Sequence, residues 1–398
     1  MAEEVKKTKK KKFGKIKTVA TVLVSVIIVF LIAATAAQRL GNLTLTAVST
    51  DVKAYFMSFS AGGGYPYEIN ASDVKDIEIN NSNLILLLNN KTTILTPTAK
   101  EIMPQEHTYS NPVMKIKGSK MIVYDLNSGK YRIQSGSEIV AEFEEKNNIM
   151  CGAIGKSGNY AIGTYSDECQ SVFTAFSKSG KKEFSYKFKS ERITAVSLSD
   201  NGKFAAVGVL NADNGVIFSK LYIFDFSKEK PISVFDYSSS AILDLNYVND
   251  TNLEVICNNM RSFIKANTLR QGDIKFNSNL LNSSSSASNG CTAIVLSRFG
   301  STAFSKLSFY TNTNKEKFSL DFNDNVKFVS TDGKYTAVLF DNTVKTFNNK
   351  GKQIGEIFFD AEPVRVQVDS GKTYVLTSVG IKCYKTRGTT DERMTENE

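Results

Sequence analysis

The sequence predicts an all-β fold: a β-propeller of eight blades that follows an N-terminal transmembrane helix. Three observations lead to this prediction. They are an uncharged apolar run at residues 18–37, a strand–turn–strand pattern that recurs along the chain, and a spacing of about 40 residues between its copies. A repeat of about 40–45 residues that holds four strands is typical of a propeller blade. A ring of seven blades is the alternative count.

The clearest copy of the repeat is the stretch Val196–Val207. Its Asp-Asn-Gly corner supplies the positive φ that a tight hairpin turn requires, and alternating apolar residues on either side can fill one buried face. Similar turns contain Gly158, Gly333 and Gly371. We therefore interpret Gly202 as a turn residue and not as part of a nucleotide-binding or sialidase-type motif.

Eight units of this kind run from residue 74 to residue 384. Their expected starts are Val74, Val113, Ile149, Ile193, Ala241, Leu280, Val326 and Val364. The eighth unit runs out of chain after three strands, and a ring must close because an open sheet edge invites aggregation. We expect Tyr67–Ile69 to complete the last blade, the propeller to cover 65–386, and the polar tail 387–398 to be disordered.

The N-terminal region predicts a membrane anchor. Residues 1–17 hold eight Lys and two Glu, and the uncharged run 18–37 follows them. Twenty helical residues span about 30 Å, the thickness of a hydrocarbon core. Positive charge before the span places the N-terminus in the cytoplasm and the C-terminal domain outside the cell, on a single-pass protein of the cell membrane. A cleaved signal peptide is the competing interpretation, because Ala34-Thr35-Ala36 resembles a cleavage site.

Between the anchor and the propeller, residues 38–64 have apolar residues at helical spacing and end in three glycines. This pattern is typical of a short amphipathic helix that lies on a membrane surface. We interpret Gly62-Gly63-Gly64 as a hinge into the propeller.

The charge distribution argues against a nucleic-acid partner. Residues 1–17 contribute +6 of the formal net charge of +9, so the remaining chain is close to neutral. It shows no basic stripe with stacking aromatics. The expected partners are therefore a protein or a cell-envelope polymer, together with the membrane.

Residues that carry catalytic or cofactor chemistry are scarce. The chain has one His, no Trp and five scattered Cys, so we predict no metal site, no cofactor and no catalytic residue. His107 is the sole candidate for a general base, and its polar loop predicts a solvated surface histidine. Cys151 and Cys169 could form a disulfide, although small apolar strand residues are the favoured interpretation of the cysteines.

Loop lengths give the only functional indication. The connections between the second and third strands are long in the third, fourth and sixth units, at 165–171, 210–219 and 298–305. In a propeller these connections emerge on one face, and long loops often carry binding residues. Two of them end in the same Phe-Ser-Lys-Leu sequence, which either begins the third strand or marks a site. The candidate binding residues are Asp167, Glu168, Asn211, Asp213, Asn214, Arg298 and Phe299.

The chain resembles an uncharacterised family, a domain of unknown function, of single-pass membrane proteins from Gram-positive anaerobes, and more distantly the WD40-like and quinoprotein-like propellers. The segments that carry the resemblance follow the anchor and are Gly63–Ile69, Ser110–Met114, Ile149–Ile154, Lys156–Ala161 and Ile193–Leu198. The resemblance implies an extracytoplasmic propeller on a membrane stalk. It implies no activity, so it assigns no catalytic residue.

The functional hypothesis is a membrane-anchored binding scaffold without enzymatic activity. The alternative is a hydrolase or lyase that acts on cell-envelope carbohydrate with carboxylates in the propeller funnel. Two or three acids that converge at the propeller axis would favour the enzyme, whereas a funnel lined by Ser, Asn and apolar groups would count against it. A sensor that signals through the lysine-rich head is a third possibility, but 17 residues hold no domain.

Overall fold

The computed structural model describes residues 62–277, 279–298 and 304–392. The predicted transmembrane segment and residues 38–61 of the juxtamembrane segment lie outside these ranges. Among the described residues, no helix is both long enough and apolar enough to cross a membrane.

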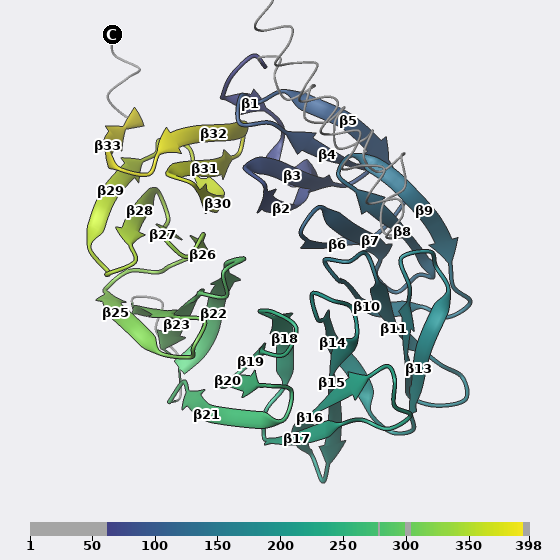
Figure 1. The fold of residues 1–398 in the computed structure, drawn as a ribbon. Helices are drawn as coiled ribbons and strands as arrows, with labels where there is room; N and C mark the ends of the chain where they lie inside the picture. The colour runs from purple at the N-terminus through teal and green to yellow at the C-terminus, as the bar shows by residue number, and fades with distance from the viewer. Residues whose placement is uncertain (1–61, 278, 299–303, 393–398) are drawn as a thin grey trace, which may run out of the picture. The chain divides into compact units, whose positions relative to one another are not determined.

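Short antiparallel strands form eight sheets around a common axis (Figure 1). The first blade follows a single 3-10 turn, η1 (Ala71–Asp73). The first four blades consist of β2 (Val74–Asn80), β3 (Asn83–Leu88), β4 (Lys91–Leu95) and β5 (Glu101–Glu106); β6 (Pro112–Lys117), β7 (Lys120–Asp125), β8 (Lys130–Ser135) and β9 (Glu138–Glu144); β10 (Ile149–Ile154), β11 (Tyr160–Tyr165), β12 (Ser171–Phe176) and β13 (Lys182–Phe188); and β14 (Arg192–Leu198), β15 (Phe204–Asp213), β16 (Val216–Asp225) and β17 (Ser233–Ser238).

The second half of the ring repeats this order. Its blades consist of β18 (Ile242–Tyr247), β19 (Leu253–Cys257), β20 (Met260–Lys265) and β21 (Leu269–Lys275); β22 (Asn279–Ser286), β23 (Thr292–Arg298), β24 (Ser305–Tyr310) and β25 (Glu316–Phe322); β26 (Phe328–Thr331), β27 (Tyr335–Leu339), β28 (Thr343–Asn348) and β29 (Gln353–Phe358), with β33 (Gly388–Asp391); and β30 (Pro363–Asp369), β31 (Lys372–Thr377) and β32 (Gly380–Lys385), with β1 (Tyr67–Glu68). The prediction of eight blades is confirmed, and each inner strand begins within two residues of its expected start.

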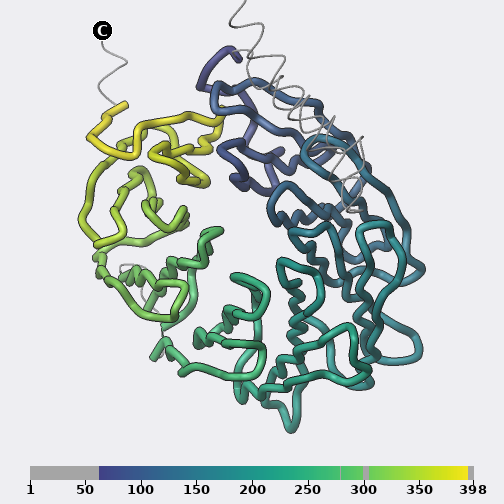
Figure 2. The backbone as a smooth tube through the Cα atoms, in the orientation of Figure 1, coloured from purple at the N-terminus to yellow at the C-terminus, as the bar shows by residue number. Residues whose placement is uncertain are grey.

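The ring closes through its first strand, as expected. β1 pairs antiparallel with β32, and Tyr67 lies opposite Ile381 while Glu68 lies opposite Gly380. The earliest and latest parts of the ring therefore lie side by side in Figure 2. Because β1 occupies the outer edge of the eighth blade, that blade has the same four strands as the others.

The expectation of a disordered tail from residue 387 is wrong for residues 388–391. Gly388–Asp391 forms β33, which pairs in parallel with β29 as a fifth strand of the seventh blade. Thr386 is buried, and its carbonyl accepts a hydrogen bond of 2.6 Å from the Thr346 hydroxyl. The unpaired backbone groups of an outer strand favour such an added strand over a solvated tail.

Each interface between neighbouring blades contains its own apolar cluster. Between the third and fourth blades, for example, Phe173, Phe188, Ile193 and Phe224 pack together. The clusters at the interfaces of blades 1 and 2 and of blades 5 and 6 are the smallest. Those two interfaces also hold the buried guanidinium groups of Arg132 and Arg261. These two interfaces therefore combine a smaller apolar cluster with a buried guanidinium group.

The antiparallel order gives the ring two different rims. The connections between second and third strands and the links between blades emerge on one rim, which we call the loop rim. The connections between first and second strands and between third and fourth strands emerge on the opposite rim, which we call the turn rim. The inner strands surround the axis of the ring (Figure 1), and we call the region that they enclose the channel.

Candidate functional site

The predicted loop of the third blade lies on the loop rim. Asp167 and Glu168 are both exposed there. The Glu168 carboxylate accepts a hydrogen bond of 2.6 Å from the Lys187 ammonium, and this bond lowers the pKa of Glu168. Both partners are exposed, so the ion pair contributes little to stability.

The prediction of a long loop in the fourth blade is wrong, because residues 210–219 extend the β15–β16 hairpin. Asn211 pairs with Phe218 and Asp213 pairs with Val216. Asn214 and Gly215 form a two-residue turn with φ of +49° and +79°, which matches the twist of a hairpin. The sequence prediction failed because the polar residues at the tip conceal the alternating pattern of a strand.

The hairpin tip extends beyond its flanking strands. β14 begins opposite Leu210, and β17 ends opposite Phe218. The residues between these positions pair only with each other. Val216 is 53% exposed and Ile217 is 40% exposed. The tip therefore offers an apolar surface and unpaired backbone groups to a partner.

The structure brings two of the three predicted loops together. The Arg192 guanidinium donates a hydrogen bond to the Tyr165 hydroxyl and lies 4.9 Å from the centre of its ring. Arg192 also pairs with Leu210 at the base of the hairpin, so it joins the loop of the third blade to the hairpin of the fourth. The third predicted loop belongs to the sixth blade, with the fifth blade in between. There, Arg298 lies 4.6 Å from the ring of Phe304, and Phe299 lies outside the described residues.

The repeated Phe-Ser-Lys-Leu sequence is structural. Ser219, inside β16, and Ser305, the first residue of β24, are both fully buried. Their Oγ atoms accept hydrogen bonds of 3.1 Å from the backbone N–H groups of Ile242 and Val326, at the inner strand of the next blade or the link just before it. Ser171 has the same role toward the next blade, without the flanking motif. The motif therefore marks a bond between blades, at the start of the third strand in the sixth blade and inside the third strand in the fourth.

Exposed apolar side chains lie near the loop-rim ends of the inner strands, a region that we call the mouth of the channel. Six of the eight inner strands carry a β-bulge near their start, at Lys75, Met150, Thr194, Leu243, Asn282 and Val364. Bulges re-aim side chains, and they are frequent near functional sites. Leu243 and Val364 are 51% and 47% exposed, and Leu280 nearby is 50% exposed. These apolar groups lie on the same rim as the hairpin tip.

Charged side chains occupy the middle of the channel, a feature that the sequence analysis missed. Lys115 of the second blade reaches across to Asp244 of the fifth blade, with 3.6 Å between Nζ and Oδ1. Arg365 of the eighth blade forms an ion pair with Asp76 of the first blade, with 2.5 Å between Nη1 and Oδ1. Glu78 lies two residues beyond Asp76 on β2, and the electrostatic effects of Asp76, Lys115, Arg365 and Asp244 all reach it. Alternation along β2 places Asp76 and Glu78 on one face of the strand.

The environment of Glu78 favours its neutral form. Desolvation by the surrounding protein, followed by repulsion from Asp76, raises the pKa of Glu78 to about 7, against the opposing effects of Lys115 and Arg365. The Asp244 carboxylate raises the pKa of Lys115 despite burial. At neutral pH, Glu78 is therefore divided between its two protonation states.

His107 differs from the solvated histidine that the sequence predicts. Its ring stacks on Tyr109 with 4.9 Å between ring centres, and its Nδ1 accepts a hydrogen bond of 3.3 Å from the Tyr109 N–H. Burial and then the nearby Arg132 charge lower the pKa of His107 to about 4. The histidine is half-buried because its link packs into the interface of the first two blades.

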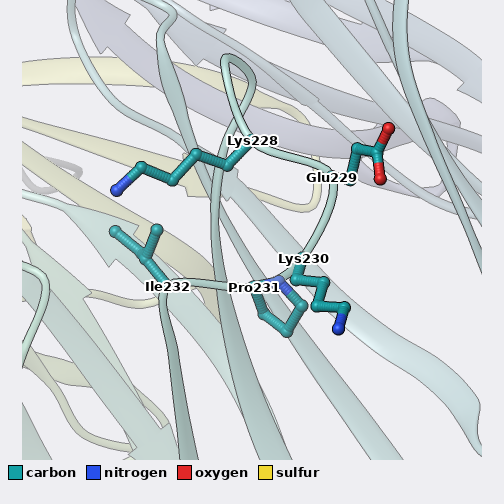
Figure 3. Close-up of a pocket in the computed structure, with 5 residues that line it drawn as sticks. All are labelled: Lys228, Glu229, Lys230, Pro231 and Ile232. Carbon is teal, nitrogen blue, oxygen red and sulfur yellow. The ribbon is translucent and has the colours of Figure 1, made fainter.

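Other chemistry is sparse in the described part of the chain. It contains no group of three His, Cys, Asp or Glu residues arranged to hold a metal ion. Cys151 and Cys169 are both free thiols, and Cys151 packs in the core between blades 3 and 4. Figure 3 shows a shallow depression on the turn rim, lined by Lys228–Ile232, in which the charged groups of Lys228, Glu229 and Lys230 point in different directions. It has no converging groups that would bind a substrate.

Sequence comparison assigns the propeller to a family. Residues 64–383 match the family of unknown function DUF5711. The chain belongs to this family. The match to DUF5711 confirms the expectation of a domain of unknown function and covers almost the whole ring. No curated protein matches the chain in sequence.

Three solved structures show the propeller fold of this DUF5711 chain. A eukaryotic initiation factor has a TM-score of 0.54 at 12% identity, and the alignment covers 82% of this chain and 89% of that chain. Sqt1 of Chaetomium thermophilum, bound to the N-terminus of the ribosomal protein L10, has a TM-score of 0.54 at 11% identity, and the alignment covers 81% of this chain and 100% of Sqt1. The β-propeller domain of Cps50 (Swd1) from Myceliophteria thermophila has a TM-score of 0.51 at 12% identity, and the alignment covers 69% of this chain and 96% of that domain. These similarities concern the fold alone.

Proposed function

We propose that the protein is a membrane-anchored, extracytoplasmic scaffold that binds a protein partner at its loop rim. The observation that carries this proposal is the β15–β16 tip, which projects Val216 and Ile217 into solvent on the same rim as the apolar mouth of the channel. Exposed apolar groups with unpaired backbone nearby are typical of protein interaction sites. The similar Sqt1 propeller was solved with the N-terminus of a ribosomal protein, which supports peptide or protein binding as a use of this fold.

Photo-crosslinking in native membranes tests the partner site. A photoreactive amino acid replaces Ile217 of the full chain, and a second variant carries it at Val140, an apolar residue of β9 that is 54% exposed and lies away from the loop rim. We expect a discrete protein adduct at position 217 that the Val216→Ser substitution weakens. An adduct of equal yield at position 140, or none at 217, would contradict the proposed site.

Membrane topology is tested separately. A reporter that is active only outside the cytoplasm, fused to the C-terminus of the full chain, should be active. Its activity in the cytoplasm would contradict the proposed orientation of the anchor.

The channel supports a second candidate function, a hydrolase or lyase of cell-envelope carbohydrate. Asp76, Glu78 and Asp244 lie in the channel, and the pKa of Glu78 near 7 suits a proton donor. Two of the three acids are held in ion pairs, which leaves Glu78 as the proposed general acid.

Release of reducing ends from purified envelope polysaccharide by the full chain tests the enzymatic function. We expect activity that declines above pH 7, as Glu78 ionises, and that Glu78→Gln abolishes. The Glu168→Gln variant on the loop rim is the control. Activity that survives in Glu78→Gln would contradict the proposed role of Glu78 as the general acid.

A further inference from the structure

The two rims of the propeller carry opposite charge. The described connections of the turn rim contain eleven lysines and four acids, whereas those of the loop rim contain three lysines and nine acids. The turn-rim lysines are Lys100, Lys156, Lys178, Lys181, Lys203, Lys228, Lys230, Lys315, Lys334, Lys350 and Lys352. The loop-rim acids are Asp73, Glu145, Asp167, Glu168, Glu191, Asp324, Asp341, Asp360 and Glu362.

The four acids of the turn rim are too few to balance its eleven lysines, and two of the four also hold turns. Asp332 accepts hydrogen bonds from the backbone N–H groups of Lys334, Tyr335 and Ser370. Asp250 accepts one of 2.7 Å from the Asn201 N–H. Except for Lys100, the turn-rim lysines have exposed side chains. The rim therefore presents ammonium groups to solvent on the third, fourth, sixth and seventh blades.

The polypeptide enters the propeller at this same rim. Gly62 N–H donates a hydrogen bond of 3.2 Å to the Thr98 hydroxyl, and Gly64 N–H donates one of 3.1 Å to the Thr98 carbonyl. Thr98 belongs to the turn between β4 and β5. A Cβ atom at Gly62 would lie 2.3 Å from the Thr98 carbonyl oxygen, so the entering chain lies directly against the turn rim.

We propose that the turn rim docks on an anionic membrane surface, with lipid phosphate groups as the ligands of its lysines. This proposal rests on the proposed membrane anchor. The predicted surface helix reaches Phe59, and three residues of chain from there to Gly62 can span at most about 10 Å. That limit is close to the Debye length of about 8 Å at physiological salt, so a turn rim that lies flat on the surface brings its lysines within the field of anionic lipid headgroups. The acidic loop rim then faces away from the membrane, toward the partner.

Hydrogen exchange of the full chain in vesicles tests this docking. One set of vesicles contains phosphatidylcholine alone, and in the other a third of the lipid is phosphatidylglycerol. We expect several-fold slower exchange in the turns at 177–181, 226–232 and 349–352 with the anionic vesicles only, and no change in the loop rim. The difference should disappear in 1 M salt, where the Debye length falls to about 3 Å.

Matched charge variants locate the contact. The substitutions Lys178→Gln, Lys181→Gln, Lys350→Gln and Lys352→Gln remove charge from the third and seventh blades, which lie opposite each other in the ring, and should abolish the slowing. Lys146→Gln with Lys189→Gln, two exposed lysines of the loop rim, should leave it unchanged. Equal exchange in both kinds of vesicle, or slowing on the loop rim, would overturn the docking.

Two further measurements separate the possible failures. Flotation with the phosphatidylcholine vesicles reports the anchor, so a chain that floats without turn-rim protection contradicts the docking and leaves the anchor intact. Addition of soluble polyphosphate to the phosphatidylcholine vesicles tests an anionic polymer as the ligand. Protection by polyphosphate, without protection by anionic lipid, would overturn the proposal in favour of such a polymer.

Discussion

Buried serine hydroxyls connect neighbouring blades at several points. Besides Ser171, Ser219 and Ser305, the inner-strand residues Ser197 and Ser330 accept hydrogen bonds from Tyr247 and Val368 of the following blade. Ser197 belongs to the hairpin repeat that predicts the fold. A serine in this repeat therefore satisfies a backbone N–H group that the blade geometry leaves without a strand partner.

Loss of one such hydroxyl should destabilise the ring. Ser219→Ala leaves the buried Ile242 N–H without its acceptor, which should lower the free energy of unfolding by about 1–3 kcal/mol. Urea unfolding of the full chain measures the change. Ser179→Ala, at an exposed turn position, is the control and should change stability by less than about 0.5 kcal/mol. Equal stability of both variants would contradict the role of Ser219.

His107 should make stability depend on pH. Its folded-state pKa of about 4 lies below the ordinary value of 6.5. The folded protein therefore binds fewer protons than the unfolded chain between these values. The free energy of unfolding should fall as the pH drops from 6.5 toward 4, by about 2 kcal/mol once partial exposure is allowed for.

The His107→Phe variant isolates this effect, because it keeps an aromatic ring against Tyr109 and removes the titration. Denaturant unfolding of both proteins at pH 7 and pH 4 gives the comparison, since the carboxylates titrate in each. A pH dependence that is the same in the two proteins would show that His107 is not held neutral.

At the scale of the element, the interface of the fifth and sixth blades is distinctive because it is built on a buried ion pair. Arg261 and Glu254 are almost fully buried, with 2.6 Å between Nε and Oε1. The Ser286 hydroxyl donates to the other carboxylate oxygen of Glu254 at 2.8 Å, and Arg261 lies 4.8 Å from the ring of Tyr310. Ser286 and Tyr310 belong to the sixth blade, so the pair binds the two blades together.

Removal of one partner should be more harmful than removal of both. Glu254→Gln leaves the Arg261 charge buried without its counter-ion and should cost about 3–5 kcal/mol. The double variant Glu254→Met with Arg261→Met should be more stable than Glu254→Gln, because apolar groups of similar volume replace the pair. Unfolding of the two variants and the parent protein measures this order. The reverse order would mean that the charges themselves stabilise the interface.

Sequence reasoning located most strands and failed where pairing is non-local. Alternating residues and turn glycines such as Gly202 act within one hairpin, so they predict the blades and their starts. The pairing of Gly388–Asp391 with β29 depends on a strand edge some 30 residues away, and no local pattern reports it. The channel cluster escaped notice because Lys115 and Asp244 meet only when the ring closes. The sequence did offer one indication of this cluster, because charged residues occur within the predicted inner strands.

The whole ring depends on a close fit at its closure. A Cβ atom at Gly380 would lie 2.6 Å from the backbone oxygen of Tyr67 in β1. Gly380→Ala should therefore displace β1 from β32 and lower the thermal unfolding temperature, with a loss of about 1–3 kcal/mol. Gly272→Ala is the matched control, because it is also a strand glycine and its Cβ would meet no atom within 4 Å.

Limited proteolysis of the two variants adds a local measurement. Displacement of β1 should expose the chain near residues 62–68 to cleavage in Gly380→Ala and not in Gly272→Ala. Resistance of both variants to cleavage would contradict the importance of this closure for the ring.

The pairing of β1 with β32 also sets an order of events during synthesis. Tyr67 emerges early, but its partner Ile381 is made more than 300 residues later. At a synthesis rate of about 5–20 residues per second, the first strand waits for tens of seconds before its sheet exists. Throughout that time the blades accumulate as an open arc with two unpaired ends. The synthesis of β32 decides when the ring first becomes complete.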